Sequence, residues 1–117
     1  MKPIDMNNVQ EWLDYFTDKQ VYVHLETTNG AYASHLNKKA YNVGAYIRNA
    51  QVSFNQAKII KDGNIHRVGL KLEMGWIYAE GLTDSEMTED KKLLLAGHDR
   101  EGRLMVALEI SETPFDY

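Results

Sequence analysis

The hydrophobic positions of the chain follow two periods, a helical one near the beginning and a period of two from about residue 20 onward. The helical period covers about residues 8–17 and places four apolar side chains on one stripe: Val9, Trp12, Leu13 and Phe16. Asn8 and Glu11 have the spacing of a capping box, and Asp5 offers an alternative N-cap. The sequence therefore predicts one N-terminal helix whose apolar face, Trp12 included, lies in the core.

The period of two predicts strands from about residue 20 to residue 111, separated by short turns. Asn29-Gly30 is a strong signal for a two-residue hairpin loop. Three further turns are expected at Asp62-Gly63, Met74-Gly75 and Asp99 to Gly102. Consecutive strands are therefore expected to pair as antiparallel hairpins.

Two places interrupt this alternation. The parity of the apolar residues changes near Asn55-Gln56, which predicts a bulge or a break. The polar, acidic segment 83–90 is expected to be a connection, and Pro114 stops the last strand. The whole pattern predicts a mainly β protein, a single antiparallel barrel- or sandwich-like sheet built from hairpins with one N-terminal α-helix, in a single domain over residues 1–117.

Composition narrows the class of protein. A chain with 44% hydrophobic and 26% charged residues is typical of a folded domain, and the lack of cysteine excludes disulfides and thiolate chemistry. The net charge is −4 and the 13 basic residues are scattered, so nucleic acid is not an expected partner. The N-terminus has no apolar signal region, and no run approaches the ~18 apolar residues of a membrane span. We therefore expect a cytoplasmic protein with no membrane partner.

The hairpin predicted at Asn29-Gly30 raises a metal hypothesis. With these two residues as the loop, His24 lies directly opposite His35, and Glu26 shares their face. The Cβ atoms of such a pair are about 4.5–5.5 Å apart, so both imidazoles reach one ion. Two histidines and one carboxylate bind zinc in hydrolases and iron in oxygenases. The same face carries small and polar side chains, so a solvated strand face without a metal is the alternative.

A second candidate site is a charged and aromatic surface. Trp76 and Tyr78 are expected to share a strand face with Arg67 across the turn at Met74-Gly75. If Arg48 joins them, this surface offers a binding site for a small anionic compound. Cross-strand aromatic packing and ion pairs are the alternative explanation.

No catalytic residue is predicted. The sequence contains no phosphate-binding glycine loop, no nucleophile elbow and no His-Glu-x-x-His helix. His66 has the apolar parity of its strand and is expected to be a hydrogen-bonded core residue. His98 is expected to contact Asp99 or solvent.

Several stretches along nearly the whole chain resemble the YojF family of small bacterial proteins, namely "MKPIDMNNVQ", "VYVHLETTNGAYASH", "AYNVGAYIRN", "GLKLEMGWIYAEGLT", "LLLAGHDREGRL" and "SETPF". The resemblance implies a β-rich fold and brings no assigned catalytic residues. The family is associated with a gene neighbourhood that holds a metal-dependent deacetylase of bacillithiol synthesis. This association implies an accessory role near bacillithiol metabolism, and it implies that deacetylase as a protein partner.

The sequence leads to two functional hypotheses. The first is a non-catalytic binding or accessory module for a protein partner or a small metabolite, with no cofactor. We expect it to be a homo-oligomer, with a dimer favoured, because a small sheet must cover its strand edges. The alternative is a mononuclear metal-dependent enzyme that holds zinc or iron through His24, Glu26 and His35.

Overall fold

The computed structural model describes residues 1–29, 38–39 and 41–116, which contain one helix and nine strands. The elements are β1 (Lys2–Pro3), α1 (Met6–Phe16), β2 (Val21–Thr28), β3 (Gly44–Val52), β4 (Phe54–Asp62), β5 (Ile65–Leu72), β6 (Trp76–Leu82), β7 (Asp84–Met87), β8 (Leu93–His98) and β9 (Leu104–Ser111). The described helix is too short to cross a membrane. The predicted mainly β fold with one N-terminal helix is confirmed.

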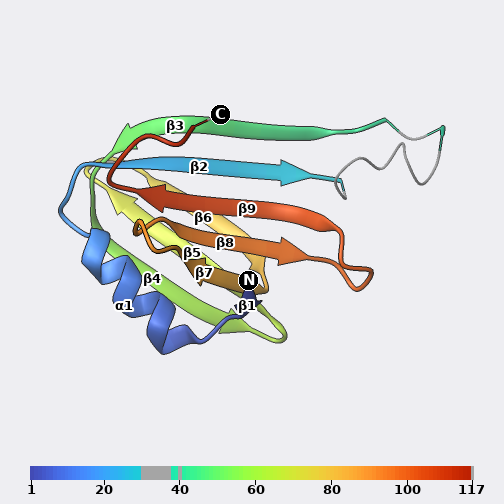
Figure 1. The fold of residues 1–117 in the computed structure, drawn as a ribbon, viewed down its shortest axis with the longest axis horizontal. Helices are drawn as coiled ribbons and strands as arrows, with labels where there is room; N and C mark the ends of the chain where they lie inside the picture. The colour runs from blue at the N-terminus through green and yellow to red at the C-terminus, as the bar shows by residue number, and fades with distance from the viewer. Residues whose placement is uncertain (30–37, 40, 117) are drawn as a thin grey trace.

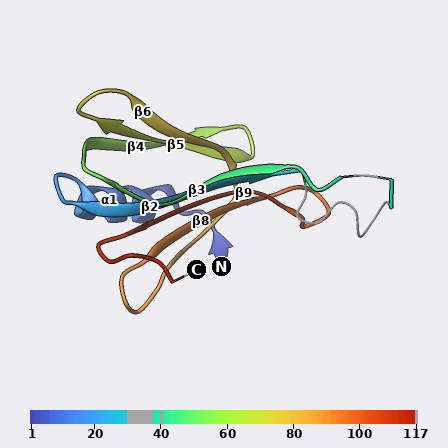
Figure 2. The same cartoon turned by 90° about the horizontal axis from the view of Figure 1, so that it is seen from above.

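The strands form two antiparallel sheets that lie in separate layers. The larger sheet has the order β1-β7-β8-β9-β2-β3, and the smaller has the order β4-β5-β6 (Figure 1). Figure 2 shows β4, β5 and β6 as one layer above β2, β3, β8 and β9. Of the two predicted architectures, the described residues form the sandwich-like one and no closed barrel.

Helix α1 packs its predicted apolar stripe into the core between the sheets. Val9, Leu13 and Phe16 are fully buried, whereas Trp12 is only partly buried against the core. The helix begins two residues earlier than expected because Asp5 is its N-cap, and the Asp5 carboxylate accepts a hydrogen bond from the Asn8 backbone at 3.2 Å. The alternative start at Asp5 is therefore the one used.

The change of apolar parity in the middle of the chain marks the passage from one sheet to the other. β3 belongs to the large sheet and β4 to the small one, with Ser53 between them. The β4–β5 ladder shifts register between Phe54 and Gln56, so the bulge predicted near Asn55-Gln56 is confirmed. The turn predicted at Asp62-Gly63 is also confirmed, with Gly63 in the left-handed region at φ 64.

The pairing predicted for β2 is wrong. Thr28 pairs with Gly44 instead of residue 31, and β2 lies between β3 and β9 in the sheet. Both edges of β2 are therefore occupied, and the residues expected to form the partner strand, His35 among them, lie outside the described residues. The side chain of Asn29 contacts the residues just before β3, because its amide donates to the Tyr41 carbonyl at 2.8 Å and accepts from the Val43 backbone at 3.0 Å.

The segment 83–90 was expected to be a connection, and that prediction is also wrong in part. Residues 84–87 form β7, which pairs with β8 on one side and with the two-residue strand β1 on the other. Ser85 is buried in this strand despite its polar neighbours. Neither the hydropathy of this polar segment nor its turn residues predict a strand. The pairing with β8 makes it one.

Candidate functional site

The candidate ligand surface lies on the outer face of the small sheet. The turn between β5 and β6 is closed by a hydrogen bond from the Leu72 backbone N–H to the Gly75 carbonyl at 3.0 Å. This turn sets Lys71 opposite Trp76 and Gly69 opposite Tyr78. Because paired residues and alternate residues share a face, Trp76, Tyr78 and Arg67 lie together as predicted.

Trp76 and Tyr78 form a stacked aromatic pair. Their ring centroids are 5.4 Å apart and their planes differ by 8°. About half of each residue is exposed, 47% for Trp76 and 52% for Tyr78. A Cβ atom added to Gly69 would lie 2.8 Å from Cε1 of Tyr78 and 3.6 Å from Cζ3 of Trp76, so the glycine lets the rings lie against the sheet. We refer to the Trp76 and Tyr78 rings over Gly69 as the aromatic platform.

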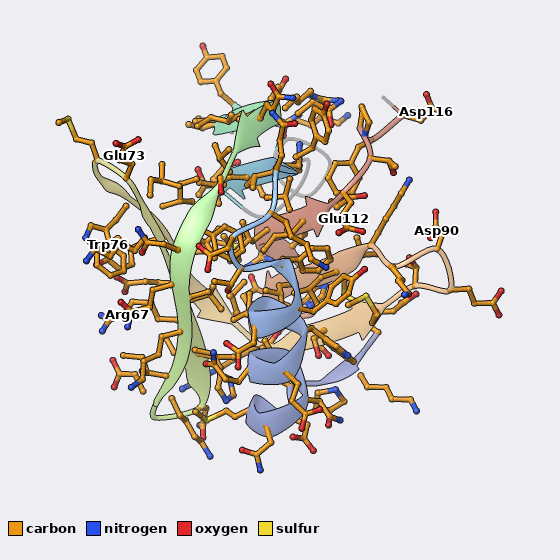
Figure 3. The ribbon with its side chains drawn as sticks, turned by 90° about the vertical axis from the view of Figure 1, so that its left-hand side faces the viewer. Arg67, Glu73, Trp76, Asp90, Glu112 and Asp116 are labelled. Atoms are coloured by element: carbon orange, nitrogen blue, oxygen red, sulfur yellow. The ribbon has the colours of Figure 1, made fainter. Side chains whose placement is uncertain are left out.

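Basic side chains surround the aromatic platform. Arg67 and Lys71 flank Gly69 on β5, and Lys58 is the partner of Gly69 on β4. Glu73 and Glu80 are the acidic neighbours, and the Oε1 atom of Glu80 is 3.9 Å from Nη1 of Arg67. The side chains of Arg67 and Glu80 are exposed, so their ion pair is weak. Three basic and two acidic side chains give this surface an excess of one positive charge. Figure 3 shows Arg67 and Trp76 projecting outward from the same side of the molecule.

Arg48 does not join this surface. It lies on β3 of the large sheet, where its guanidinium carbon stands 4.6 Å from the centre of the Tyr46 ring. Arg48 and Tyr46 line a shallow hollow together with Glu26. Sequence parity could place Arg48 on a face of its own strand, but it could not assign that strand to the other sheet.

Two of the three predicted metal ligands lie together. His24 is 2% exposed on β2, and its Nε2 atom is 3.0 Å from Oε1 of Glu26. This separation suits two donors of one ion and equally suits a direct ion pair. The cross-strand neighbour of His24 is Glu109 on β9 instead of His35, which lies outside the described residues. Within the described ranges, no three histidine or acidic side chains are grouped as metal ligands.

The other two histidines take different positions. His66 is buried as expected, but its Nδ1 atom has no hydrogen-bond partner among the residues that the structure describes. His98 was expected to contact Asp99 or solvent; its side chain is 34% exposed, and its Nδ1 atom lies 3.1 Å from Oδ1 of Asp84. The sequence does not indicate this pair, because the polar segment that holds Asp84 is typical of a connection.

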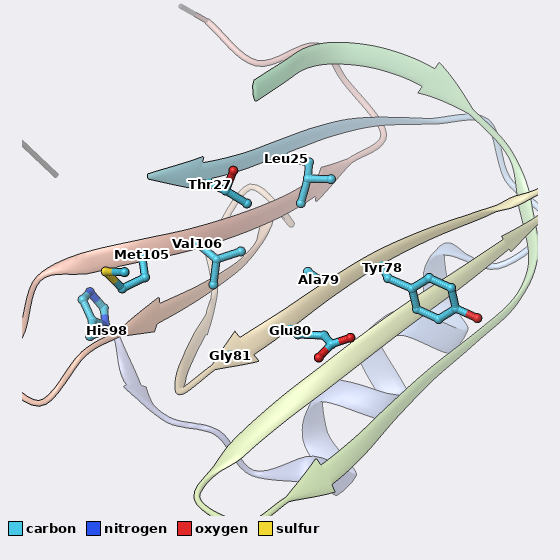
Figure 4. Close-up of a pocket in the computed structure, with 9 residues that line it drawn as sticks. All are labelled: Leu25, Thr27, Tyr78, Ala79, Glu80, Gly81, His98, Met105 and Val106. Atoms are coloured by element: carbon cyan, nitrogen blue, oxygen red, sulfur yellow. The ribbon is translucent and has the colours of Figure 1, made fainter. Parts of the chain in front are cut away.

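His98 stands at the edge of a hollow of about 380 Å³ between the sheets. Its lining is mostly apolar and includes Leu25, Ala79 and Val106, with Tyr78, Glu80 and His98 as its ionisable members (Figure 4). The Thr83 hydroxyl, and after it the His98 imidazole, hold the pKa of Asp84 below its usual value, against the opposing effect of burial. Asp84 therefore stays ionised and orients the imidazole through Nδ1.

Comparisons with known proteins agree with the sequence resemblance. A family model described as "Protein of unknown function (DUF1806)" matches residues 3–115. "Uncharacterized protein YojF" of Bacillus subtilis (strain 168) is 54% identical over 115 residues, which are 98% of this chain and 98% of that protein. The crystal structure of the Bacillus subtilis YojF protein matches with a TM-score of 0.82 and 46% sequence identity, covering 99% of this chain and 97% of that one. The chain therefore belongs to the DUF1806 family and is similar along nearly its whole length to YojF.

Proposed function

We propose that this protein is a non-catalytic binding module of the cytoplasm, and that the aromatic platform is its ligand surface. The observation that carries this proposal is the parallel arrangement of Trp76 and Tyr78, which leaves about half of each residue exposed. Large aromatic side chains that only stabilised the sheet would gain more by burying their faces. A stacked pair that is half exposed leaves ring surface on which a ligand can pack.

The charges around the rings define the class of ligand. Lys58, Arg67 and Lys71 share the face with two acidic neighbours, Glu73 and Glu80. A ligand with a flat apolar side and an anionic group would place the first on the rings and the second beside the cations. Each stacked ring contributes about 0.5–1.5 kcal/mol beyond the area it buries, so we expect a weakly bound small metabolite, such as a phosphorylated sugar or an aromatic carboxylate.

The two tryptophans of the chain, Trp12 and Trp76, make this testable by NMR. Each gives one indole N–H resonance, and the Trp76→Phe variant assigns them. Glucose 6-phosphate and benzoate serve as anionic probes, with glucose as the uncharged comparison. We expect the Trp76 resonance to shift with at least one anion and less with glucose, while the Trp12 resonance stays in place. Equal shifts at both indoles, or no shift of Trp76 with either anion, would contradict the proposal.

Charge variants test the role assigned to the cations. Arg67→Gln and Lys71→Gln should each weaken the response to the anionic probe several-fold, because each removes one positive charge beside the rings. Lys2→Gln is the matched control, since Lys2 lies on β1 of the other sheet. An equal loss of binding in all three variants would mean that the platform has no local preference for anions.

A protein partner is the second form of the same binding proposal. The resemblance to YojF supports an accessory role near bacillithiol metabolism, in which a deacetylase is the partner. Native pull-down with the intact chain and with Trp76→Ala tests whether the platform takes part. Recovery of a deacetylase by the intact chain alone is the expected result, and recovery of none by either chain would remove this form of the proposal.

A further inference from the structure

The four outer edges of the two sheets are protected to different degrees. The edge of β4 is closed by the side chain of Gln10 on α1. Its amide nitrogen donates to the Ala57 carbonyl at 2.9 Å, and its oxygen accepts from the Ile59 backbone N–H at 3.1 Å. The side chain thus makes the two hydrogen bonds that another strand would make.

Two other edges are short or covered. β1 has only two residues, Lys2 and Pro3, and proline cannot donate to a further strand. The end of β6 lies close against β8. A Cβ atom added at Gly97 would therefore overlap the Gly81 carbonyl and would lie 2.6 Å from Val106. The β1 edge is therefore too short for a long ladder, and the β6 edge is covered at its Gly81 end.

The remaining edge belongs to β3. Among the described residues, no strand pairs with its outer side. The Val43 carbonyl accepts a hydrogen bond from the Asn29 backbone N–H at 3.0 Å, so the backbone groups of Val43 face β2. Because backbone groups alternate along a strand, those of Gly44 and Tyr46 turn outward. The side chains beside this edge are apolar and exposed, 58% for Tyr46 and 53% for Ile47.

We propose that β3 pairs antiparallel with β3 of a second copy of this chain, about a two-fold axis at Tyr46. Outward-facing residues must lie opposite each other for the backbones to exchange hydrogen bonds. An axis at Tyr46 sets Tyr46 opposite Tyr46 and Gly44 opposite Arg48, and so uses the strand up to the bulge at Asn49, where φ is 53. The two large sheets then join into one continuous sheet.

Charge and size support a second copy as the partner. Arg48 is the one charged side chain between residues 44 and 48, so self-pairing brings no like charges face to face. Four residues separate the two arginines along the strands, about 13 Å at ~3.3 Å per residue, which exceeds the screening length of about 8 Å in physiological salt. Ile47 falls opposite the small side chain of Ala45, and the paired Tyr46 rings lie side by side.

A single introduced cysteine tests this geometry, because the natural chain has none. Directly opposite residues in a hydrogen-bonded antiparallel pair have Cα atoms about 5.5 Å apart, within the range of a disulfide. The Tyr46→Cys variant should therefore form a covalent dimer under mild oxidation. The matched control is Met74→Cys, whose site is 92% exposed in the turn between β5 and β6. We expect at least a tenfold slower cross-link in this control, and equal rates would overturn the proposal.

A proline variant tests the pairing without cross-linking. The N–H of Tyr46 faces outward, so Tyr46→Pro removes no hydrogen bond to β2 but blocks the new pair. We expect a dimer mass by light scattering for the natural chain and for Tyr46→Phe, and a monomer mass for Tyr46→Pro. Ile47→Lys, which adds a charge beside the edge, should also give a monomer. A monomeric natural chain, or a dimer that persists in both Tyr46→Pro and Ile47→Lys, would overturn the proposal.

Discussion

The Nδ1 atom of His98 lies 3.1 Å from Oδ1 of Asp84, which joins the end of β8 to the beginning of β7. The Thr83 hydroxyl donates to the same carboxylate oxygen at 2.6 Å and accepts from the His98 backbone N–H at 3.1 Å. Three polar side chains thus form one network at the corner where β6 passes into β7. Removal of any member leaves the others without part of their hydrogen bonding.

The lowered pKa of Asp84 predicts how this network responds to acid. A carboxyl whose folded pKa is depressed stabilises the fold above its unfolded pKa, near 3.9, and loses that contribution as the pH falls through the folded pKa. Asp84→Asn should lower the free energy of unfolding at pH 7 by about 1 kcal/mol. The difference from the natural chain should shrink at the acid end, below pH ~3.9, in urea denaturation.

Glu89→Gln is the control for this titration, because Glu89 is exposed in the turn before β8. Its stability should follow that of the natural chain across the pH range. A pH-independent difference between Asp84→Asn and the natural chain would show that the carboxylate charge has no part in the stabilisation.

The two hydrogen bonds between the Gln10 side chain and the β4 backbone should contribute strongly to the free energy of unfolding. Gln10→Ala leaves the Ala57 carbonyl and the Ile59 N–H without their partner, at a cost of about 1–3 kcal/mol in the free energy of unfolding. Urea denaturation measures this cost. Gln56→Ala, at an exposed position on the same strand β4, is the control and should change stability by less than about 0.5 kcal/mol. Equal effects would mean that water replaces the Gln10 amide without loss.

Two glycines should respond differently to alanine. At Gly97 the added Cβ meets the Gly81 backbone, which cannot move without shifting β6. At Gly69 it meets the exposed ring of Tyr78, which can turn away. Gly97→Ala should therefore destabilise the protein by about 1–3 kcal/mol, and Gly69→Ala by less.

Gly69→Ala should instead disturb the aromatic platform and reduce the NMR response of Trp76 to the anionic probes. Thermal unfolding and the indole titration measure the two effects on the same samples. Comparable unfolding temperatures for the two variants would contradict the contacts assigned to Gly97.

Metal analysis separates the binding module from the alternative enzyme. The contact between His24 and Glu26 keeps the metal hypothesis open, although both edges of β2 are occupied and the cross-strand neighbour of His24 is Glu109 instead of His35. We expect protein purified without chelator to carry no stoichiometric zinc or iron by elemental mass spectrometry. Near-stoichiometric metal that disappears in His24→Ala and His35→Ala would instead support the mononuclear metal enzyme.

Local sequence patterns determined the elements whose neighbours are close in the chain. The apolar stripe of α1 predicts its buried face, and Asp5 was among its predicted caps. The turn at Asp62-Gly63 and the alternation after it predict the β4–β5 hairpin. The face shared by Arg67, Trp76 and Tyr78 follows from a period of two and one short turn. A tight turn and its two strands contain within a few residues the backbone and side-chain preferences that form them.

Tertiary structure alone decided the pairings between distant segments. Asn29-Gly30 predicts a tight hairpin by local propensity, but β2 pairs with β3 and β9, where its two edges gain ladders and Val21 and Val23 are buried. The polar segment that holds Asp84 becomes β7 by pairing with β8. These partners are selected by the burial and hydrogen bonding of whole sheets, which no short window of sequence contains. For the same reason the sequence could place Arg48 on a strand but could not show that the strand belongs to the opposite sheet from Trp76.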